Sequence, residues 1–155
     1  MILTHTISLS AKEKQAVFKL WNLEYPKRLN YVKIEEFEYY LDGLENPHHV
    51  LVKDEHNGIL GWFVDFKREN EIWFAMILDT SIHGKGIGSN LLEKAKKKNG
   101  ILNGWVIDSS EYLKKDNLIY RSPLEFYLKN DFKILKETRL ESPRISAVKI
   151  KWTAN

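Results

Sequence analysis

The sequence contains no cysteine, which excludes disulfide bonds, thiolate metal ligands and a cysteine nucleophile. It also contains no apolar run near the roughly 20 residues that cross a bilayer as a helix. The first residues, from Met1 to His5, lack the basic and apolar regions of a signal peptide. We therefore expect a cytoplasmic protein with no membrane partner.

A large excess of charge is also lacking, because 24 basic and 21 acidic residues give a formal net charge of only +3. The one local concentration of positive charge lies between Lys94 and Lys98, where a helix is expected to end. Lysines in a last helical turn stabilise the helix dipole and need no other role. Nucleic-acid binding needs a broader basic face with interleaved aromatic residues, so we expect no nucleic-acid partner.

Residues 1–155 fit a single globular domain, because 43% are hydrophobic, 29% are charged and no linker or repeat interrupts them. Capping boxes at Ser10–Glu13 and Ser122–Glu125 mark the starts of the first and last helices, and another helix is expected over 33–42. Strands are expected at residues 4–8, 49–53, 59–66, 71–78, 104–108, 132–135 and 144–152. The resulting order, β-α-α-β-β-β-α-β-α-β-β, predicts an α/β domain with an antiparallel meander and one parallel crossover.

A glycine-rich stretch, His83-Gly84-Lys85-Gly86-Ile87-Gly88, joins the apolar strand 71–78 to a helix. Glycines at such a junction let backbone N–H groups approach a ligand, and the helix N-terminus adds donors and a favourable dipole. The positions of its glycines and lysine exclude both the Walker A loop and the Rossmann fingerprint. The stretch therefore predicts a phosphate-binding loop of another kind, with a plain tight turn as the alternative.

This stretch resembles the pyrophosphate loop of the GNAT acetyltransferase superfamily, Gln/Arg-x-x-Gly-x-Gly/Ala, with histidine at its first position. A second motif supports the resemblance, since Tyr127 precedes Asp131-Phe132 at the spacing of a family tyrosine before Gly-Phe. Asp131 replaces the glycine and can adopt its left-handed conformation. The element order is also that of the family. The resemblance implies an α/β (α+β) fold: a mixed, mostly antiparallel, twisted sheet of about seven strands flanked by about four helices.

The resemblance further implies transfer of an acetyl group from acetyl-CoA to a primary amine of a small molecule by direct attack. Amides of the glycine loop would surround the CoA pyrophosphate, and the end of strand 71–78 would pair with the pantetheine arm. This pairing requires the two neighbouring strands to separate there. The residues expected to bind CoA are Ile77, Leu78, Asp79, His83, Gly84, Lys85, Gly86, Ile87, Gly88 and Ser89.

Tyr127 matches the family tyrosine that protonates the departing CoA thiolate, a role that suits a phenol because it stays protonated at neutral pH. Its alternative is an amphipathic core residue. The candidates for a general base are Glu71, Asp108 and Asp79. Counting back from the glycine loop puts Glu71 on the opposite sheet face from the family glutamate. The amine could instead lose its proton to water.

Two neighbouring histidines, His48 and His49, could suggest a metal site. Successive residues of a strand point to opposite faces of the sheet, so the pair cannot hold one ion. We therefore expect no metal.

Two segments are candidates for the acceptor side of the site. Residues 109–121 precede the tyrosine helix and form either a lid or short helix beside the acceptor, or a plain surface insertion. Tyr120 stands where relatives usually carry asparagine. Acidic and aromatic residues of the helix 33–42 would suit an amine if they face the cleft, and otherwise belong to an ordinary amphipathic helix. They are Glu35, Glu36, Tyr39 and Tyr40.

Two other functions stay open beside a small-molecule N-acetyltransferase. One is a CoA-binding sensor or interaction domain that has lost catalysis, and the other is a protein or peptide N-acetyltransferase. The presence of Tyr127 favours an enzyme. The final strands could pair two copies into a homodimer, or Lys149 and Lys151 could protect a solvent-facing edge.

Overall fold

The computed structural model describes residues 1–155. Seven strands form one sheet in the order β1-β2-β3-β4-β5-β7-β6. The strands are β1 (Ile2–Thr6), β2 (Glu45–Lys53), β3 (Ile59–Arg68), β4 (Glu71–Leu78), β5 (Ile101–Val106), β6 (Lys133–Glu141) and β7 (Ser146–Thr153). The helices are α1 (Ala11–Glu24), α2 (Ile34–Asp42), α3 (Ile87–Lys98) and α4 (Leu124–Lys129), with short 3-10 turns at Lys27–Leu29 and Thr80–Ile82. The expected fold class, element order and antiparallel meander are confirmed.

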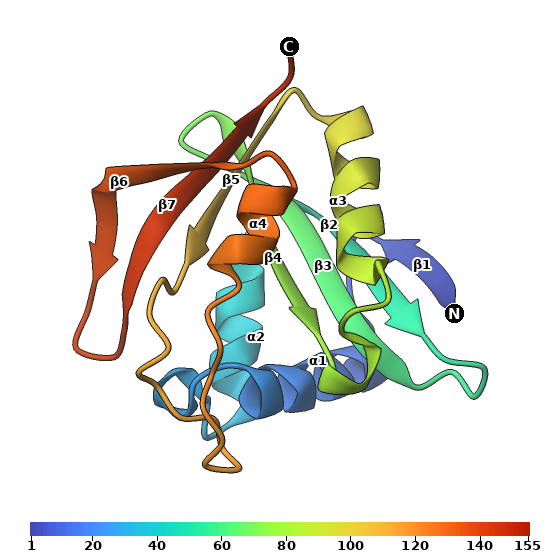
Figure 1. Cartoon of the computed structure of the whole chain (residues 1–155). Helices are drawn as coiled ribbons and strands as arrows, with labels where there is room; N and C mark the ends of the chain where they lie inside the picture. Colours follow the sequence, from blue (N-terminus) through green and yellow to red (C-terminus); the bar gives the residue numbers. More distant parts are fainter.

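The helices cover both faces of the sheet, with α3 and α4 in front of it in the view of Figure 1 and α2 behind. Alternation along β3 explains this arrangement, because its odd and even residues point to opposite faces. Trp62 packs with Trp21 and Phe37 of the first two helices, whereas Phe63 packs in the cluster that contains Leu92 and Tyr127. The sheet therefore carries one hydrophobic core on each face.

The sheet divides between β4 and β5, which form its one parallel pair. These strands pair only at Trp73 and Asn103, near the beginning of each strand. Beyond that point β4 continues to Leu78 along β3, and β5 continues to Val106 along β7. The facing edges therefore lie unpaired toward the ends of β4 and β5, as a pantetheine-binding split requires.

The two expected capping boxes differ in outcome. At Ser10 the box is confirmed, because the Ser10 amide donates to Glu13 Oε1 (2.8 Å) and the Glu13 amide donates to Ser10 Oγ (3.2 Å). At Ser122 the prediction is wrong. The Ser122 amide donates to Ser110 Oγ (3.1 Å) and its hydroxyl donates to the Ile107 carbonyl (2.6 Å). The Ser122 hydroxyl also accepts from the Leu124 amide (3.3 Å), so the serine ties the start of α4 to the end of β5 without the reciprocal pair with Glu125 that a box requires.

Several strand boundaries also differ from the prediction. β1 and β5 begin before the predicted residues and end two residues earlier than expected. β2 begins at Glu45, four residues early, because a register shift between Glu45 and His48 accommodates Pro47. The last strand, β7, lies between β5 and β6, so Lys149 and Lys151 do not protect an edge. β6 forms that edge instead.

His48 and His49 do point to opposite faces. The His49 ring meets the indole N–H of Trp62 at 3.0 Å, whereas His48 meets Lys98 Nζ at 2.9 Å beneath α3. No three histidine, aspartate or glutamate side chains come together as a metal site. None of the helices is long and apolar enough to span a membrane.

Candidate active site

The glycine loop follows the end of β4 through a capped turn. The Asp79 carboxylate accepts hydrogen bonds from the Ser81 amide (2.9 Å) and hydroxyl (2.6 Å), which fixes the turn Thr80–Ile82. Gly84 and Gly86 then adopt left-handed φ values of 73° and 79°. An L side chain is strained in that conformation, so both positions favour glycine.

The start of α3 is open to a ligand. Gly86 is the N-cap and supplies no side-chain cap, and the first intrahelical bond runs from the Asn90 amide to the Gly86 carbonyl. The amides before Asn90 therefore have no partner within the helix. No atom lies within 4 Å of a Cβ built at Gly84 or Gly86. Free donors, a helix dipole and open space are what a phosphate needs.

Gly88 has a different role from the other two glycines. A Cβ at Gly88 would lie 2.8 Å from Cζ of Phe126 in α4 and 3.4 Å from Cδ1 of Leu78. Glycine is therefore needed here so that α4 can pack against the first turn of α3. This contact holds the tyrosine helix against the phosphate loop.

The other residues expected to bind CoA lie around this junction. His83 turns back onto the strand, with Nε2 2.8 Å from the Leu78 carbonyl oxygen. Its ring therefore braces the loop against β4. Lys85 is exposed on the loop, and the Asp79 amide donates to the Leu60 carbonyl of β3 (2.8 Å). Ile77 is buried and pairs with Trp62.

Tyr127 lies in α4 and is only 6% exposed. Its ring packs against Phe74 and Phe132, with centroids 5.7 and 5.6 Å away. Burial raises the pKa of the Tyr127 hydroxyl, and the nearby Tyr120 adds a smaller effect in the same direction. The phenol therefore holds its proton at neutral pH. Asp131 ends the helix with φ 68°, which confirms its expected left-handed conformation.

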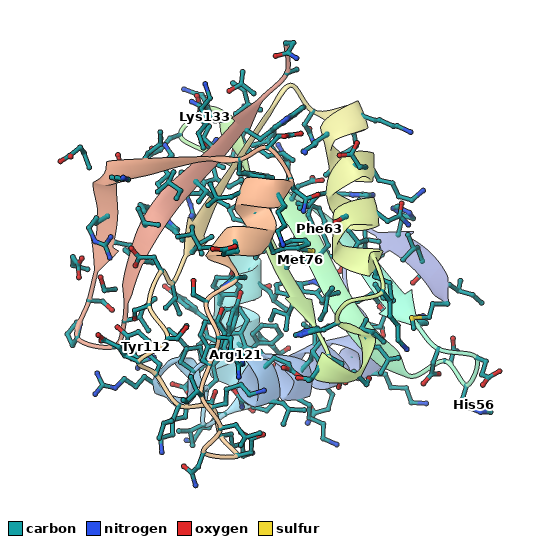
Figure 2. All side chains as sticks on the ribbon, in the orientation of Figure 1. His56, Phe63, Met76, Tyr112, Arg121 and Lys133 are labelled. Atoms are coloured by element: carbon teal, nitrogen blue, oxygen red, sulfur yellow. The ribbon has the colours of Figure 1, made fainter.

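Residues 107–123, called the strap below, connect β5 to α4 and are anchored on the end of α1. The Lys27 amide donates to the Leu113 carbonyl (2.8 Å), and Lys27 Nζ donates to Asn117 (3.1 Å). On its other side, the Ser146 amide donates to the Tyr112 hydroxyl (2.9 Å). Tyr112 and Arg121 of the strap lie on the same side of the molecule as α1 (Figure 2).

Glu24 links the strap to the cofactor side, and the sequence analysis did not identify it. Its carboxylate is buried and accepts hydrogen bonds from the Thr80 amide (2.9 Å) and hydroxyl (2.8 Å), with Lys114 Nζ at 3.4 Å. Thr80 begins the turn Thr80–Ile82 that leads into the glycine loop. An acidic residue at the end of an apolar helix was the one available signal, and nothing in the sequence connects it to Thr80.

A group of tyrosines gathers between α1, α2 and the strap. The rings of Tyr25, Tyr31 and Tyr40 pack around the Trp21 indole, with centroids 4.6, 5.3 and 5.2 Å from it. Tyr120 of the strap lies 6.5 Å from Tyr25. Burial raises the pKa of Tyr40 to about 12 and also raises the pKa of Tyr25 and the pKa of Tyr120. These phenols are therefore neutral hydrogen-bonding groups.

Two of the candidate bases, Glu71 and Asp108, are held by cations, and the third, Asp79, caps the turn described above. Glu71, at the opposite end of β4 from Leu78, accepts from Asn103 (2.9 Å) and Lys151 (3.3 Å). Asp108 forms a two-point pair with Arg139, with both distances 3.0 Å. These hydrogen bonds lower the pKa of each carboxyl group. The largest contribution comes from Asn103 for Glu71 and from Arg139 for Asp108. A lower pKa makes each carboxylate a weaker base.

Comparisons with known proteins agree with this geometry. The family model described as the acetyltransferase (GNAT) domain matches residues 46–134, more than half of the chain. No curated protein matches the sequence. Among solved structures, an aminoglycoside 6'-N-acetyltransferase complexed with coenzyme A is similar, with TM-score 0.70, 14% identity and coverage of 99% of this chain and 97% of that one.

Two further solved structures share the fold. The aminoglycoside 6'-N-acetyltransferase from Enterococcus faecium gives TM-score 0.69 at 19% identity, covering 99% of this chain and 97% of that chain. A GNAT superfamily phosphinothricin acetyltransferase from Sinorhizobium meliloti, in complex with AcCoA, gives 0.64 at 13% identity, covering 100% and 90%. With the family model spanning the split, the glycine loop and the tyrosine helix, the chain belongs to the GNAT acetyltransferase family.

Proposed function

We propose that this protein transfers the acetyl group of acetyl-CoA to a primary amine of a small molecule by direct attack. One observation carries the proposal: the unpaired edges of β4 and β5 separate between an open phosphate loop and a buried, protonated tyrosine. A thioester bound along this split has its pyrophosphate at one end and its sulfur near Tyr127.

The residues of the loop fit CoA. The free amides from Gly84 to Ser89 would hold the pyrophosphate, with Lys85 adding charge. The unpaired edge of β4 near Ile77 and Leu78 would hydrogen-bond the pantetheine arm as an added strand would. Bound CoA supplies the activated acetyl thioester.

In the proposed reaction the neutral amine nitrogen attacks the thioester carbonyl carbon and forms a C–N bond. The intermediate collapses with cleavage of the C–S bond, and the thiolate takes the proton of the Tyr127 hydroxyl. Because Glu71 and Asp108 are both engaged by cations, we propose that solvent takes the proton lost by the amine. Solvent then restores the proton to Tyr127, so charge and atoms balance.

The test measures thiol release from acetyl-CoA with a panel of primary amines. Replacement of Tyr127 with phenylalanine should lower kcat by about 100-fold, the usual contribution of a positioned acid, and leave CoA affinity unchanged. The matched control is Tyr112→Phe, which removes a hydroxyl that contacts Ser146 outside the split. An unchanged kcat in the Tyr127 variant would contradict the assigned role.

The same assay separates the two alternatives. CoA binding without release of thiol for any amine would favour a sensor domain over an enzyme. Acetylation of peptides in preference to small amines would favour a protein N-acetyltransferase. The anchoring of the strap on Lys27 argues against that outcome, because it occupies the side of α1 where a peptide groove would open.

A further inference from the structure

A hollow of about 630 Å³ lies between α2 and the turn that joins β6 to β7. It opens to solvent, and four of its six lining residues are the acidic and aromatic residues of the helix 33–42 that would suit an amine. Its lining consists of Tyr31, Glu35, Glu36, Tyr39, Tyr40 and Arg144.

Opposite charges face each other across this hollow without pairing. Glu35 and Glu36 lie on α2, Arg144 lies on the turn, and none of the three takes part in an ion pair within the protein. One oxygen of Glu36 accepts from the amides of Val32 and Lys33 (3.1 and 3.0 Å), which fixes this carboxylate in place. A ligand that carries both charges could pair with both walls.

The hollow adjoins the proposed reaction site through the tyrosine group. Tyr31 and Tyr40 line the hollow and share the Trp21 indole with Tyr25. Tyr25 in turn lies beside Tyr120 of the strap. A row of packed phenol rings therefore connects the lining of the hollow to the strap, which leads into α4.

We propose that the acceptor is a small diamino acid, whose side-chain amine is acetylated while its amino-acid end occupies this hollow. Glu35 and Glu36 pair with its α-ammonium group, and Arg144 pairs with its carboxylate in the planar geometry that a guanidinium favours. A polycation would leave a positive group opposite Arg144, and an acidic ligand would meet the two glutamates. This inference rests on the proposed acetyl transfer and adds the class of its acceptor.

The test uses four acceptors of similar length that differ in one charged group each. Lysine carries both charges at its far end, 1,5-diaminopentane lacks the carboxylate, 6-aminohexanoate lacks the α-ammonium, and pentylamine lacks both. We expect kcat/KM for lysine to exceed that of each singly charged acceptor by roughly tenfold or more, as loss of a charge-assisted hydrogen bond predicts. Mass spectrometry should locate the acetyl group on the side-chain nitrogen.

Variants then assign each charge to its wall. Arg144→Gln should lower kcat/KM about tenfold for lysine and 6-aminohexanoate and leave 1,5-diaminopentane unchanged. The double replacement of Glu35 and Glu36 by glutamine should lower kcat/KM for lysine and for 1,5-diaminopentane. It should leave kcat/KM for 6-aminohexanoate unchanged. Lys133→Gln is the matched control, because this exposed lysine begins β6, whereas Arg144 lies on the turn after the end of β6. Figure 2 shows Lys133 at the other end of the molecule from Tyr112.

The outcomes separate this inference from the proposed function. Turnover of other amines with none for lysine, acetylation of its α-nitrogen, or equal effects of Arg144→Gln on all four acceptors would overturn the diamino acid alone. Absence of turnover with every amine, despite CoA binding, would overturn acetyl transfer and the inference together.

Discussion

Replacing Glu24 with glutamine preserves the size of the side chain but removes its charge and one acceptor oxygen. Both carboxylate oxygens accept in the native protein, from the Thr80 amide and hydroxyl and from Lys114. Glutamine keeps one acceptor oxygen and carries an NH₂ group in place of the other. At least one of the Thr80 and Lys114 donors must therefore face the NH₂ group, which cannot accept its hydrogen bond. The buried position of Glu24 limits rescue by water.

The expected loss of folding free energy is about 2–3 kcal/mol. A hydrogen bond to a charged group contributes about 1.5–3 kcal/mol, whereas removing one partner of a fully buried ion pair costs about 3–5 kcal/mol. The Lys114 side chain is 13% exposed and Glu24 is 8% exposed, so the ammonium reaches some solvent and the lower range applies. The control Glu93→Gln, at a side chain that is 61% exposed, should change stability by about 0.5 kcal/mol or less.

Denaturant unfolding followed by tryptophan fluorescence measures the stability, and calorimetric titration measures CoA affinity. Because Thr80 begins the turn that leads into the glycine loop, loosening this turn should raise the Kd for CoA roughly threefold or more, as expected if the population of the binding-competent loop falls to a third. In a double-mutant cycle with Lys114→Met, the two changes should not be additive. Stability within 0.5 kcal/mol of the native protein, together with unchanged CoA affinity, would refute the reasoning.

Three further predictions concern Gly86, Gly88 and the dependence of stability on pH. Gly86→Ala, at φ 79°, should lose about 1–2 kcal/mol of stability and weaken CoA binding, whereas Gly100→Ala, with open space and ordinary φ, should not weaken it. Gly88→Ala should cost about 1–3 kcal/mol through the 2.8 Å contact with Phe126, and Phe126→Leu should relieve part of it. Burial is the main reason that the pKa of His49 is lowered to about 4, and the neighbouring His48 is the second. Between pH 6.5 and about 4 the unfolded chain therefore binds a proton that the folded chain does not. Stability should therefore fall across that window, and His49→Phe should flatten the slope in unfolding titrations.

The sequence predicted the fold well because the fold depends mainly on local patterns. The near-continuous apolar runs of β3 and β4 and the Ser10 box each lie within one stretch of chain. The errors arose where a distant segment decides the outcome. Ser122 matched a capping box with Glu125, but its amide donates to Ser110 and its hydroxyl to Ile107. β2 begins before Pro47 because its pairing with β3 accommodates a bulge.

The two halves of the site differ in the same way. The cofactor half depends on backbone conformation, so Gly84, Gly86 and the spacing from Tyr127 are visible in the sequence before any contact is known. The proposed acceptor half depends on side chains from separate elements, such as Glu36 of α2 and Arg144 of the last turn. No spacing rule links them, and no ion pair joins them. A family can therefore keep its loop recognisable while exchanging acceptor contacts one side chain at a time, which makes Arg144→Gln a more direct probe of specificity than any change in the loop.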